Sequence, residues 1–468
     1  MTAIYLLAAL CVLVWLAAIL LRGGLLAGSL LLLLAGTCFG YPFFHVDVKP
    51  IPLTSDRVLW GVLLAQCLVW RRFGWTEHQP LNRAEVALIA LLFALGASTF
   101  LTDWKYNNSL PVSKLLFYYV MPAGLYWVAR RIQFNESSTR WLLGSLAIFG
   151  LYLAITSVAE ETKRFSLVLP RYIASQSEYP DFFGRGRGPL LNPAADGFLI
   201  AICLSCAALW WTRLGRQGKM LLLAAVGVYA AGVGCTMTRC AWIGAVLSLL
   251  IIIGLTVPKT ARVPLIAGSL LLSLALAATQ WDRIMAFKRD EGQSGQETAE
   301  SVKLRPILAM VAWNMFREQP LFGCGFGQYR KHFVNVLADR TTELPLEKSR
   351  PYVQHNVFLG LSTETGLVGM GLFALVLAYW TRDAWRLWRS DAPLWARQHG
   401  LLFLATLGTY LPNAMFHDLA IIPMVNMYLF FLAGTVTAVR PLPQTMPQSG
   451  LFTAYGAMNH PGASPRSR

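Results

Sequence analysis

The chain has 468 residues, of which 55% are hydrophobic and 14% are charged, and its formal net charge is +16. Soluble domains usually contain about 25% charged residues, so this composition argues against a soluble globular protein. Inside a bilayer each segment must satisfy its own backbone hydrogen bonds, which makes long apolar runs helices. The excess of Lys and Arg then serves as an orientation signal and does not indicate a nucleic-acid partner.

Apolar runs that are long enough to cross a bilayer follow one another along the chain. They predict an all-α, polytopic transmembrane bundle of about 12–13 helices. The predicted spans are residues 3–21, 24–42, 57–70, 86–102, 112–129, 141–158, 197–212, 220–235, 238–256, 263–281, 355–380, 399–415 and 419–438. The first run has no basic segment before it and no clear cleavage site, so we expect a retained helix.

Basic residues gather in alternate connections between these spans. Lys and Arg accumulate in cytoplasmic loops, which places this set in the cytoplasm: Arg71, Arg72, Arg83, Arg130, Arg131, Arg140, Arg213, Arg216, Lys219, Lys259, Arg262, Arg382, Arg386, Arg389 and Arg397. The N-terminus is then expected outside. The Pro-, Gly- and Ser-rich tail, 441–468, is expected to be disordered in the cytoplasm.

The spans and their connections predict six parts of the chain. These are N-terminal membrane helices (1–158), an outer loop (159–196), central membrane helices (197–281), a large outer loop (282–354), C-terminal membrane helices (355–440) and the tail (441–468). The large outer loop contains an amphipathic helix, roughly 302–317, whose apolar residues recur at helical spacing: Ile307, Leu308, Val311, Ala312 and Met315. The glycine-rich PLFGCGFG (320–327) then reads as a turn that packs this helix against the membrane.

The cysteines give little sign of redox chemistry. Cys203 and Cys206 form a CxxC inside a predicted membrane helix, where small buried residues are the simpler interpretation. Cys235 and Cys240 both lie near the outer face, where a disulfide between them is an open alternative.

Arginines in the outer segments break the orientation rule. Arg185 and Arg187 lie in GRGRG (184–188), close before a membrane helix that follows Asn192. Glycine lets a backbone approach a ligand closely, and arginine offers a rigid charged fork for phosphate oxygens. The stretch therefore fits an anionic ligand at the outer face. The alternative is that these arginines reach lipid headgroups, as long basic side chains do at interfaces.

Arg239 lies between two apolar runs, at the outer end of the span 238–256. An arginine at the centre of a membrane costs roughly 2.5–3.5 kcal/mol, and less near the ends, so a partner is expected. That partner is either a carboxylate, such as Glu364 or Asp196, or the phosphate of a ligand. Ionisable residues inside membranes mark functional sites by default.

His355 and Asn356 lie where the large outer loop returns to the membrane. Imidazole titrates near neutral pH and can exchange a proton with an acceptor hydroxyl, although an interfacial hydrogen-bonding role is the alternative. Glu364 lies nine residues on, about 13 Å along a helix and on roughly the opposite face. It is therefore expected to orient an arginine rather than to pair with His355.

Four motifs in order resemble the O-antigen ligase and O-antigen polymerase (Wzy-like) superfamily. They are Asn192–Pro193, TRCAW (238–242), PLFGCGFG and HNVFLGLSTETG (355–366), and they cover roughly residues 180–380. In the arginine motif, Cys240 replaces the glycine that the family usually carries, which affects packing rather than charge.

This resemblance implies a GT-C-like glycosyltransferase in the bacterial inner membrane, with a periplasmic active site and periplasmic outer loops. The implied donor is a glycan on undecaprenyl diphosphate, and the acceptor is lipid A core, a growing polysaccharide or, in some relatives, a protein hydroxyl. By analogy Arg239, Arg185 and Arg187 hold the diphosphate and His355 assists the acceptor, with Asn192, Asn356 and Glu364 in support.

Neither a DxD sequence nor a cluster with metal-ligand spacing is present in the sequence, so no cofactor and metal-independent chemistry are expected. Two alternatives to a ligase remain. One is a Wzy-type polymerase or protein O-oligosaccharyltransferase, which shares the donor chemistry. The other is a lipid-linked sugar flippase or transporter, which usually has internal repeats and paired broken helices; the sequence suggests neither.

Overall fold

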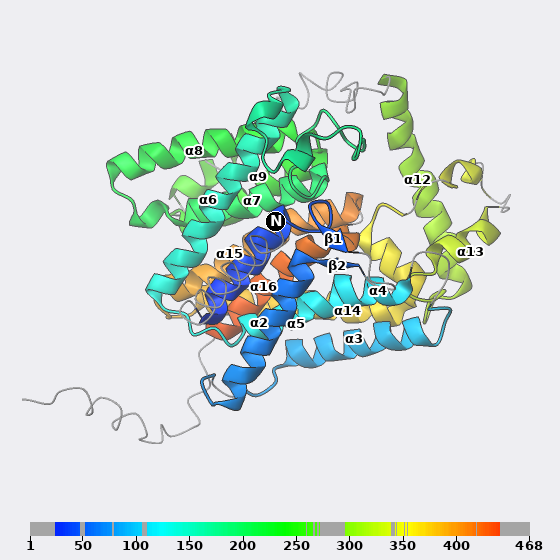
Figure 1. Ribbon diagram of the computed structural model, residues 1–468, viewed down its shortest axis with the longest axis horizontal. Coiled ribbons are helices and arrows are strands. Elements are labelled where there is room, and N and C mark those ends of the chain that lie inside the picture. Colours follow the sequence, from blue (N-terminus) through cyan, green and yellow to red (C-terminus); the bar gives the residue numbers. More distant parts are fainter. Residues whose placement is uncertain are drawn as a thin grey trace, which may run out of the picture.

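The computed structural model describes residues 24–46, 52–76, 79–104, 110–258, 260–264, 267–268, 271, 295–337, 342, 344–350, 352, 354–417 and 419–439. These residues fold mainly as helices packed side by side (Figure 1). One short antiparallel pair of strands, β1 (His45–Val46) and β2 (Leu53–Thr54), is present among them. The predicted all-α membrane fold is confirmed.

The N-terminal part contains an apolar helix, Gly24–Cys38, followed by α2 (Ser55–Arg72), α3 (Arg83–Phe100), α4 (Pro111–Leu115), α5 (Met121–Ala129) and α6 (Glu136–Glu161). A π-helical turn, Leu116–Val120, joins α4 to α5 without a break in the chain direction. Capping boxes start two of these helices. The side chain of Asn82 accepts the amide of Glu85, and that of Asn135 accepts the amide of Ser138, which satisfies amides that the helix leaves unpaired.

The remaining helices are α7 (Pro193–Leu209), α8 (Arg216–Cys235), α9 (Arg239–Thr256), α12 (Gly295–Glu318), α13 (Tyr329–Val336), α14 (Val357–Arg389), α15 (Leu394–Phe416) and α16 (Pro423–Val439). Short 3-10 turns lie at Phe165–Leu167, Arg171–Ala174, Trp211–Arg213, Leu346–Ser349 and Leu419–Ile421. Helices α7 and α16 are buried almost along their whole length, and α8 is largely exposed, as a helix at the lipid-facing edge would be.

Six helices of the described part are long and apolar enough to cross a membrane: α3, α6, α7 with the turn that follows it, α8, α9 and α14. Gly24–Cys38 and α16 are shorter apolar helices. The predicted spans 3–21 and most of 263–281, and the tail 441–468, lie outside the described residues. Each of the other predicted spans overlaps a helix. The predicted amphipathic helix is α12, and all five of its predicted apolar residues are buried.

The connections that are rich in basic residues meet at one end of the bundle. Arg130 donates to the carbonyl oxygens of Gln79 and Pro80, each at 3.1 Å, and Arg213 donates to the side chain of Gln398 at 2.5 Å. We call this end, where α3 begins and α14 finishes, the basic end. Helices α12 and α13 lie at the right-hand side of Figure 1, where α14 begins, and we call that side the loop end. The grouping of the connections agrees with the alternation read from the sequence.

Helix α14 is broken inside its apolar stretch. Gly366 has φ +62° and ψ −160°, outside the helical region, so the helix on either side of it is not continuous. A break leaves backbone amides and carbonyls without helical partners, and in a membrane these must be satisfied by protein. Here the partner is the glycine-rich loop Pro320–Gly327. The amide of Leu367 donates to the carbonyl of Pro320 at 2.8 Å.

The same loop also caps the other side of the break. The amides of Cys324 and Gly325 donate to the carbonyls of Thr363 and Glu364, at 2.9 and 3.0 Å. Three glycines of the loop, Gly323, Gly325 and Gly327, have positive φ and lie against neighbouring backbone or side chains too closely for a Cβ atom. The loop is thus the predicted turn that packs α12 against the membrane helices, and it forms part of the backbone network of α14.

We expect Gly366→Ala to destabilise the protein by about 3 kcal/mol, because the new Cβ would overlap the backbone of Leu321 and φ is positive. Gly371→Ala is the matched control, since Gly371 lies in the same helix with nothing within 4 Å of its Cβ position, and it should stay within about 0.5 kcal/mol. Thermal unfolding of the purified protein in detergent measures both. Equal melting temperatures for the two variants would contradict the structural role of the break.

Candidate functional site

The C-terminal turn of α15 is the point where segments far apart in the sequence meet. The guanidinium of Arg305, from α12, lies 5.3 Å from the ring centre of Phe416, the last residue of α15. The side-chain amide of Asn356 donates to the carbonyl of Met415 at 2.9 Å, which places the neighbouring His355 beside the same turn. The two contacts bring the large outer loop and the start of α14 together.

The start of α9 packs against the same stretch of α15. The side-chain amide of Asn413 donates to the carbonyl of Cys240 at 3.4 Å, one residue after Arg239. One turn further along, a Cβ on Gly244 would lie 2.6 Å from the hydroxyl of Thr409, so the two helices are in close contact. The tertiary structure therefore brings Arg239, Arg305 and His355 to one helix end, and each of the three is partly or fully accessible.

Arg185 shapes the turn that presents Arg239. Its guanidinium is buried and donates to the carbonyl of Thr236, at 3.0 and 3.2 Å from two nitrogens, to the carbonyl of Met237 at 3.2 Å and to the hydroxyl of Thr238 at 2.8 Å. These three residues connect α8 to α9, and Met237 has a positive φ of 50°. The guanidinium thereby fixes a strained connection directly before the first residue of α9.

Arg187 organises the first outer loop. Its side chain is fully buried, and its Nε lies 3.5 Å from the carboxylate of Glu160. Its two terminal nitrogens donate to four loop carbonyls, those of Ile173, Ser175, Tyr179 and Asp181. The buried charge is thus compensated by one carboxylate and by hydrogen bonds, as a buried ion requires. The structure does not bring this guanidinium to the end of α15.

The glycines beside these two arginines permit close packing of the chain on itself. A Cβ on Gly186 would lie 2.6 Å from the side chain of Ser157, and one on Gly188 would overlap the carboxylate of Asp196. The amide of Gly188 also donates to Glu160 at 2.8 Å. The close backbone approach predicted for GRGRG is therefore present, and the glycines approach helices α6 and α7 of the protein itself.

Asn192 and Asn356 both cap helices. Each accepts two backbone amides of the first turn that follows it, in α7 and α14 respectively. Pro193 occupies the first position of α7, where its missing N–H costs nothing. Asn356 differs from Asn192 in that its amide nitrogen reaches across to α15, so it couples the position of His355 to that helix.

Glu364 has a different partner from the one expected. The sequence predicts that it orients an arginine, but its carboxylate accepts two backbone amides, that of Gly327 in the glycine-rich loop at 3.0 Å and that of Tyr329, the first residue of α13, at 3.4 Å. The break at Gly366 explains the difference, because it draws the loop against this face of α14. Glu364 therefore holds the loop, and through it α12, against α14.

The sequence gives no prediction for Arg305, which the structure places beside this candidate site. It lies in α12, the amphipathic helix of the large outer loop, where a basic residue on the polar face is common and does not by itself indicate a site. The available signal was its position in KLRP, directly before Pro306, in an outer segment that should be poor in arginine. Only the packing of α12 against the end of α15 shows that it lies near His355.

Desolvation by the surrounding protein and the positive charge of Arg305 both lower the pKa of His355 below its ordinary value, although part of the side chain stays accessible. Burial disfavours the charged imidazolium, and a nearby cation disfavours it further. Both effects favour the neutral imidazole over the imidazolium. A neutral imidazole can accept a proton from a hydroxyl or hold that hydroxyl by a hydrogen bond, which an imidazolium cannot do by accepting.

Residues 224–374 match the family model Wzy_C, described as O-Antigen ligase. The chain carries an O-antigen ligase domain of the O-antigen ligase/polymerase superfamily. No curated protein matches the chain. The O-antigen ligase domain runs from within α8 to within α14, so it contains Arg239, Arg305, His355 and Glu364. The resemblance read from the motifs is confirmed, and the domain indicates a multi-pass, glycosyltransferase-like membrane enzyme that uses lipid-linked glycans.

The first outer loop, with Arg185 and Arg187, lies before the O-antigen ligase domain and packs onto it. Cys235 and Cys240, both within the domain, are free thiols in the structure, as are Cys203 and Cys206 before it. A disulfide between Cys235 and Cys240 is therefore not formed, and the connection between α8 and α9 is held by Arg185 instead.

We expect Arg305→Gln to raise the pKa of His355, because removal of the cation makes the imidazolium less unfavourable. Protonation would then begin at a higher pH, and any activity that needs the neutral ring would be lost at a higher pH as the solution is acidified. NMR titration of isotope-labelled histidine, assigned with His355→Gln, measures the shift. Arg317→Gln is the matched control, twelve residues or about 18 Å further along α12. An unchanged pKa in Arg305→Gln would refute the coupling.

Proposed function

We propose that this protein transfers a glycan from undecaprenyl diphosphate to an acceptor hydroxyl, of lipid A core or a growing polysaccharide, at the periplasmic face of the bacterial inner membrane. The observation that carries the proposal is the convergence of Arg239, Arg305 and His355 on the C-terminal turn of α15. Two guanidinium groups and a neutral imidazole at one helix end suit a diphosphate and a hydroxyl that must react with each other.

The two arginines would bind the diphosphate. Arginine offers a planar fork that matches phosphate oxygens, and both side chains come from helices that hold them in fixed places. In the reaction the acceptor oxygen forms a bond to the anomeric carbon, and the bond from that carbon to the diphosphate oxygen breaks. Negative charge grows on the departing diphosphate, and preorganised cations stabilise it most at that moment. The site therefore needs no divalent ion in this proposal.

His355 would hold the acceptor. Its neutral ring can accept the hydrogen bond of the acceptor hydroxyl and take the proton as the new bond forms. Asn356 fixes its position by capping α14 and by bonding to α15. Binding of donor and acceptor against one helix end would supply the remaining acceleration through proximity.

Arg185 and Arg187 enter the proposal as positioning residues. Both are buried, and their guanidinium nitrogens donate to the protein's own carbonyls. Arg185 fixes the connection before Arg239, and Arg187 fixes the loop that carries Arg185. Asn192 and Glu364 act in the same way, through the start of α7 and through the glycine-rich loop.

A transporter fits the arrangement less well. Transporters bind near the membrane midplane, at paired broken helices. The sequence suggested no broken helix, and this expectation was wrong for α14, which breaks at Gly366. The break is filled by the chain's own loop, however, and Arg239 and His355 lie at helix beginnings rather than at the break. These placements favour chemistry at the loop end.

We expect Arg239→Ala to reduce glycan transfer by a factor on the order of 10²–10³, the usual effect of removing one preorganised group that stabilises charge in the transition state. His355→Ala should also reduce transfer severely. The assay uses purified protein in liposomes, a glycan on undecaprenyl diphosphate as donor and lipid A core as acceptor. Arg171→Ala, an exposed arginine of the first outer loop, is the control and should remain active. Full activity in both site variants would exclude the proposed site.

We expect transfer to continue in excess chelator, because the cations of the proposed site are side chains. The same liposome assay, with EDTA added and with Mg²⁺ restored afterwards, tests this point. Loss of activity that Mg²⁺ restores would show that the proposed arginines do not suffice to neutralise the diphosphate.

A further inference from the structure

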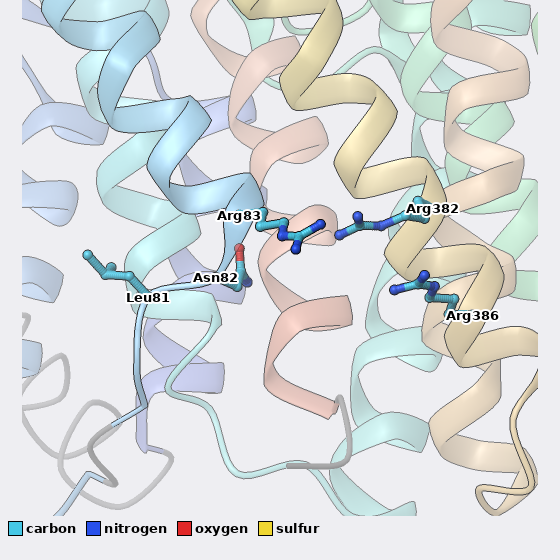
Figure 2. Close-up of a pocket in the computed structure, with 5 residues that line it drawn as sticks. All are labelled: Leu81, Asn82, Arg83, Arg382 and Arg386. Atoms are coloured by element: carbon cyan, nitrogen blue, oxygen red, sulfur yellow. The ribbon is translucent and has the colours of Figure 1, made fainter. Parts of the chain in front are cut away.

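A second cluster of arginines lies at the basic end, away from the site described above. Figure 2 shows the side chains of Arg83 and Arg382 extended toward each other from two helices, with Arg386 directed at the same space. The three line a cavity of about 460 Å³ together with Leu81 and Asn82. Arg83 is the first residue of α3, and the other two lie in the last turns of α14.

The residues that line this cavity carry an excess of positive charge. Arg382 is paired with Asp383 at 3.1 Å, whereas no described carboxylate lies within salt-bridge distance of Arg83 or Arg386. Like charges that approach each other are destabilising, and the positive end of the α3 dipole adds to the effect at Arg83. The cavity therefore has the electrostatics of an anion site.

Glu85, the acidic residue nearest to Arg83 in the sequence, already has other partners. The carboxylate of Glu85 accepts the backbone amide of Asn82 in the capping box and pairs with the buried Arg130. It is fully buried beneath the first turn of α3 and does not offset the arginines that line the cavity. Among the described residues, neither Glu85 nor Asp383 neutralises Arg83 and Arg386, which suits an anion from outside the chain.

The cavity is separate from the site at the end of α15. Arg382 lies 25 residues beyond Val357, so even along a helix with one break it is roughly 35 Å away, about the thickness of a membrane. If the end of α15 lies at one membrane face, this distance places the cavity at the level of the lipid headgroups of the opposite leaflet. Leu81, which is 58% exposed, gives it an apolar edge beside the arginines.

We propose that this cavity binds the phosphate of an anionic phospholipid headgroup. Arginine forks from two helices suit the non-bridging oxygens of a phosphodiester, and Leu81 suits the glycerol and the start of an acyl chain. Basic pockets between membrane helices at the cytoplasmic face are sites of this kind. A lipid held there would join α3 to α14. The inference does not depend on the proposed glycan transfer.

The test uses the full-length protein in non-ionic detergent. It is titrated with phosphatidylglycerol, with phosphatidylcholine and, separately, with inorganic phosphate and diphosphate, and binding is followed by native mass spectrometry. The informative variant is Arg83→Gln/Arg386→Gln, which leaves the pair between Arg382 and Asp383 intact. The matched control is Arg71→Gln/Arg72→Gln, which removes two exposed charges at the end of α2.

We expect the unmodified protein to bind phosphatidylglycerol in preference to phosphatidylcholine, and the cavity variant to lose affinity for it by about tenfold or more while the control keeps it. Equal binding by both double variants would overturn the proposal. Retention of free phosphate or diphosphate without retention of phosphatidylglycerol would overturn the lipid as the source of the anion. Should the double variant fail to fold, Arg386→Gln alone provides the same comparison.

Discussion

The need to satisfy every backbone polar group inside a membrane shapes this protein most visibly at Gly366. The break in α14 leaves amides and carbonyls that only the protein can bond, and the glycine-rich loop supplies partners on both sides of it. Because that loop directly follows α12, the same bonds fix α12 against α14. The position of Arg305 near His355 thus depends on the hydrogen bonds around Gly366, which lies about three helical turns from His355.

The arginines near the loop end divide into two kinds. Arg185 and Arg187 are buried, and their guanidinium groups donate hydrogen bonds to carbonyls of the protein. They therefore stabilise the loops. Arg239 and Arg305 are partly accessible and lie where three segments converge. The division has a physical basis, because a fully buried guanidinium survives only with most of its donors satisfied, and such a group has little left for a ligand. Burial therefore separates structural arginines from those proposed to bind substrate.

The two ends of the bundle use positive charge differently. At the loop end, guanidinium groups accompany a histidine and the helix-capping Asn356, which gives the proposed site groups that can both hold charge and move a proton. At the basic end, the cavity offers arginines and an apolar edge without a group that titrates near neutral pH among its lining residues. The first arrangement suits a reaction and the second suits binding alone.

The sequence alone predicts the membrane character, most of the spans and the family, because long apolar runs and ordered motifs are local properties of the chain. It also placed Arg239, His355 and the amphipathic α12 near the correct boundaries. It did not reveal Arg305, the partners of Arg187 and Glu364, or the break in α14. Each of these depends on contacts between segments tens to hundreds of residues apart, such as Asn356 with Met415 or Gly327 with Glu364. Which groups share a helix end follows from hydrogen bonds and packing between distant segments, and these contacts leave no periodic pattern in the sequence.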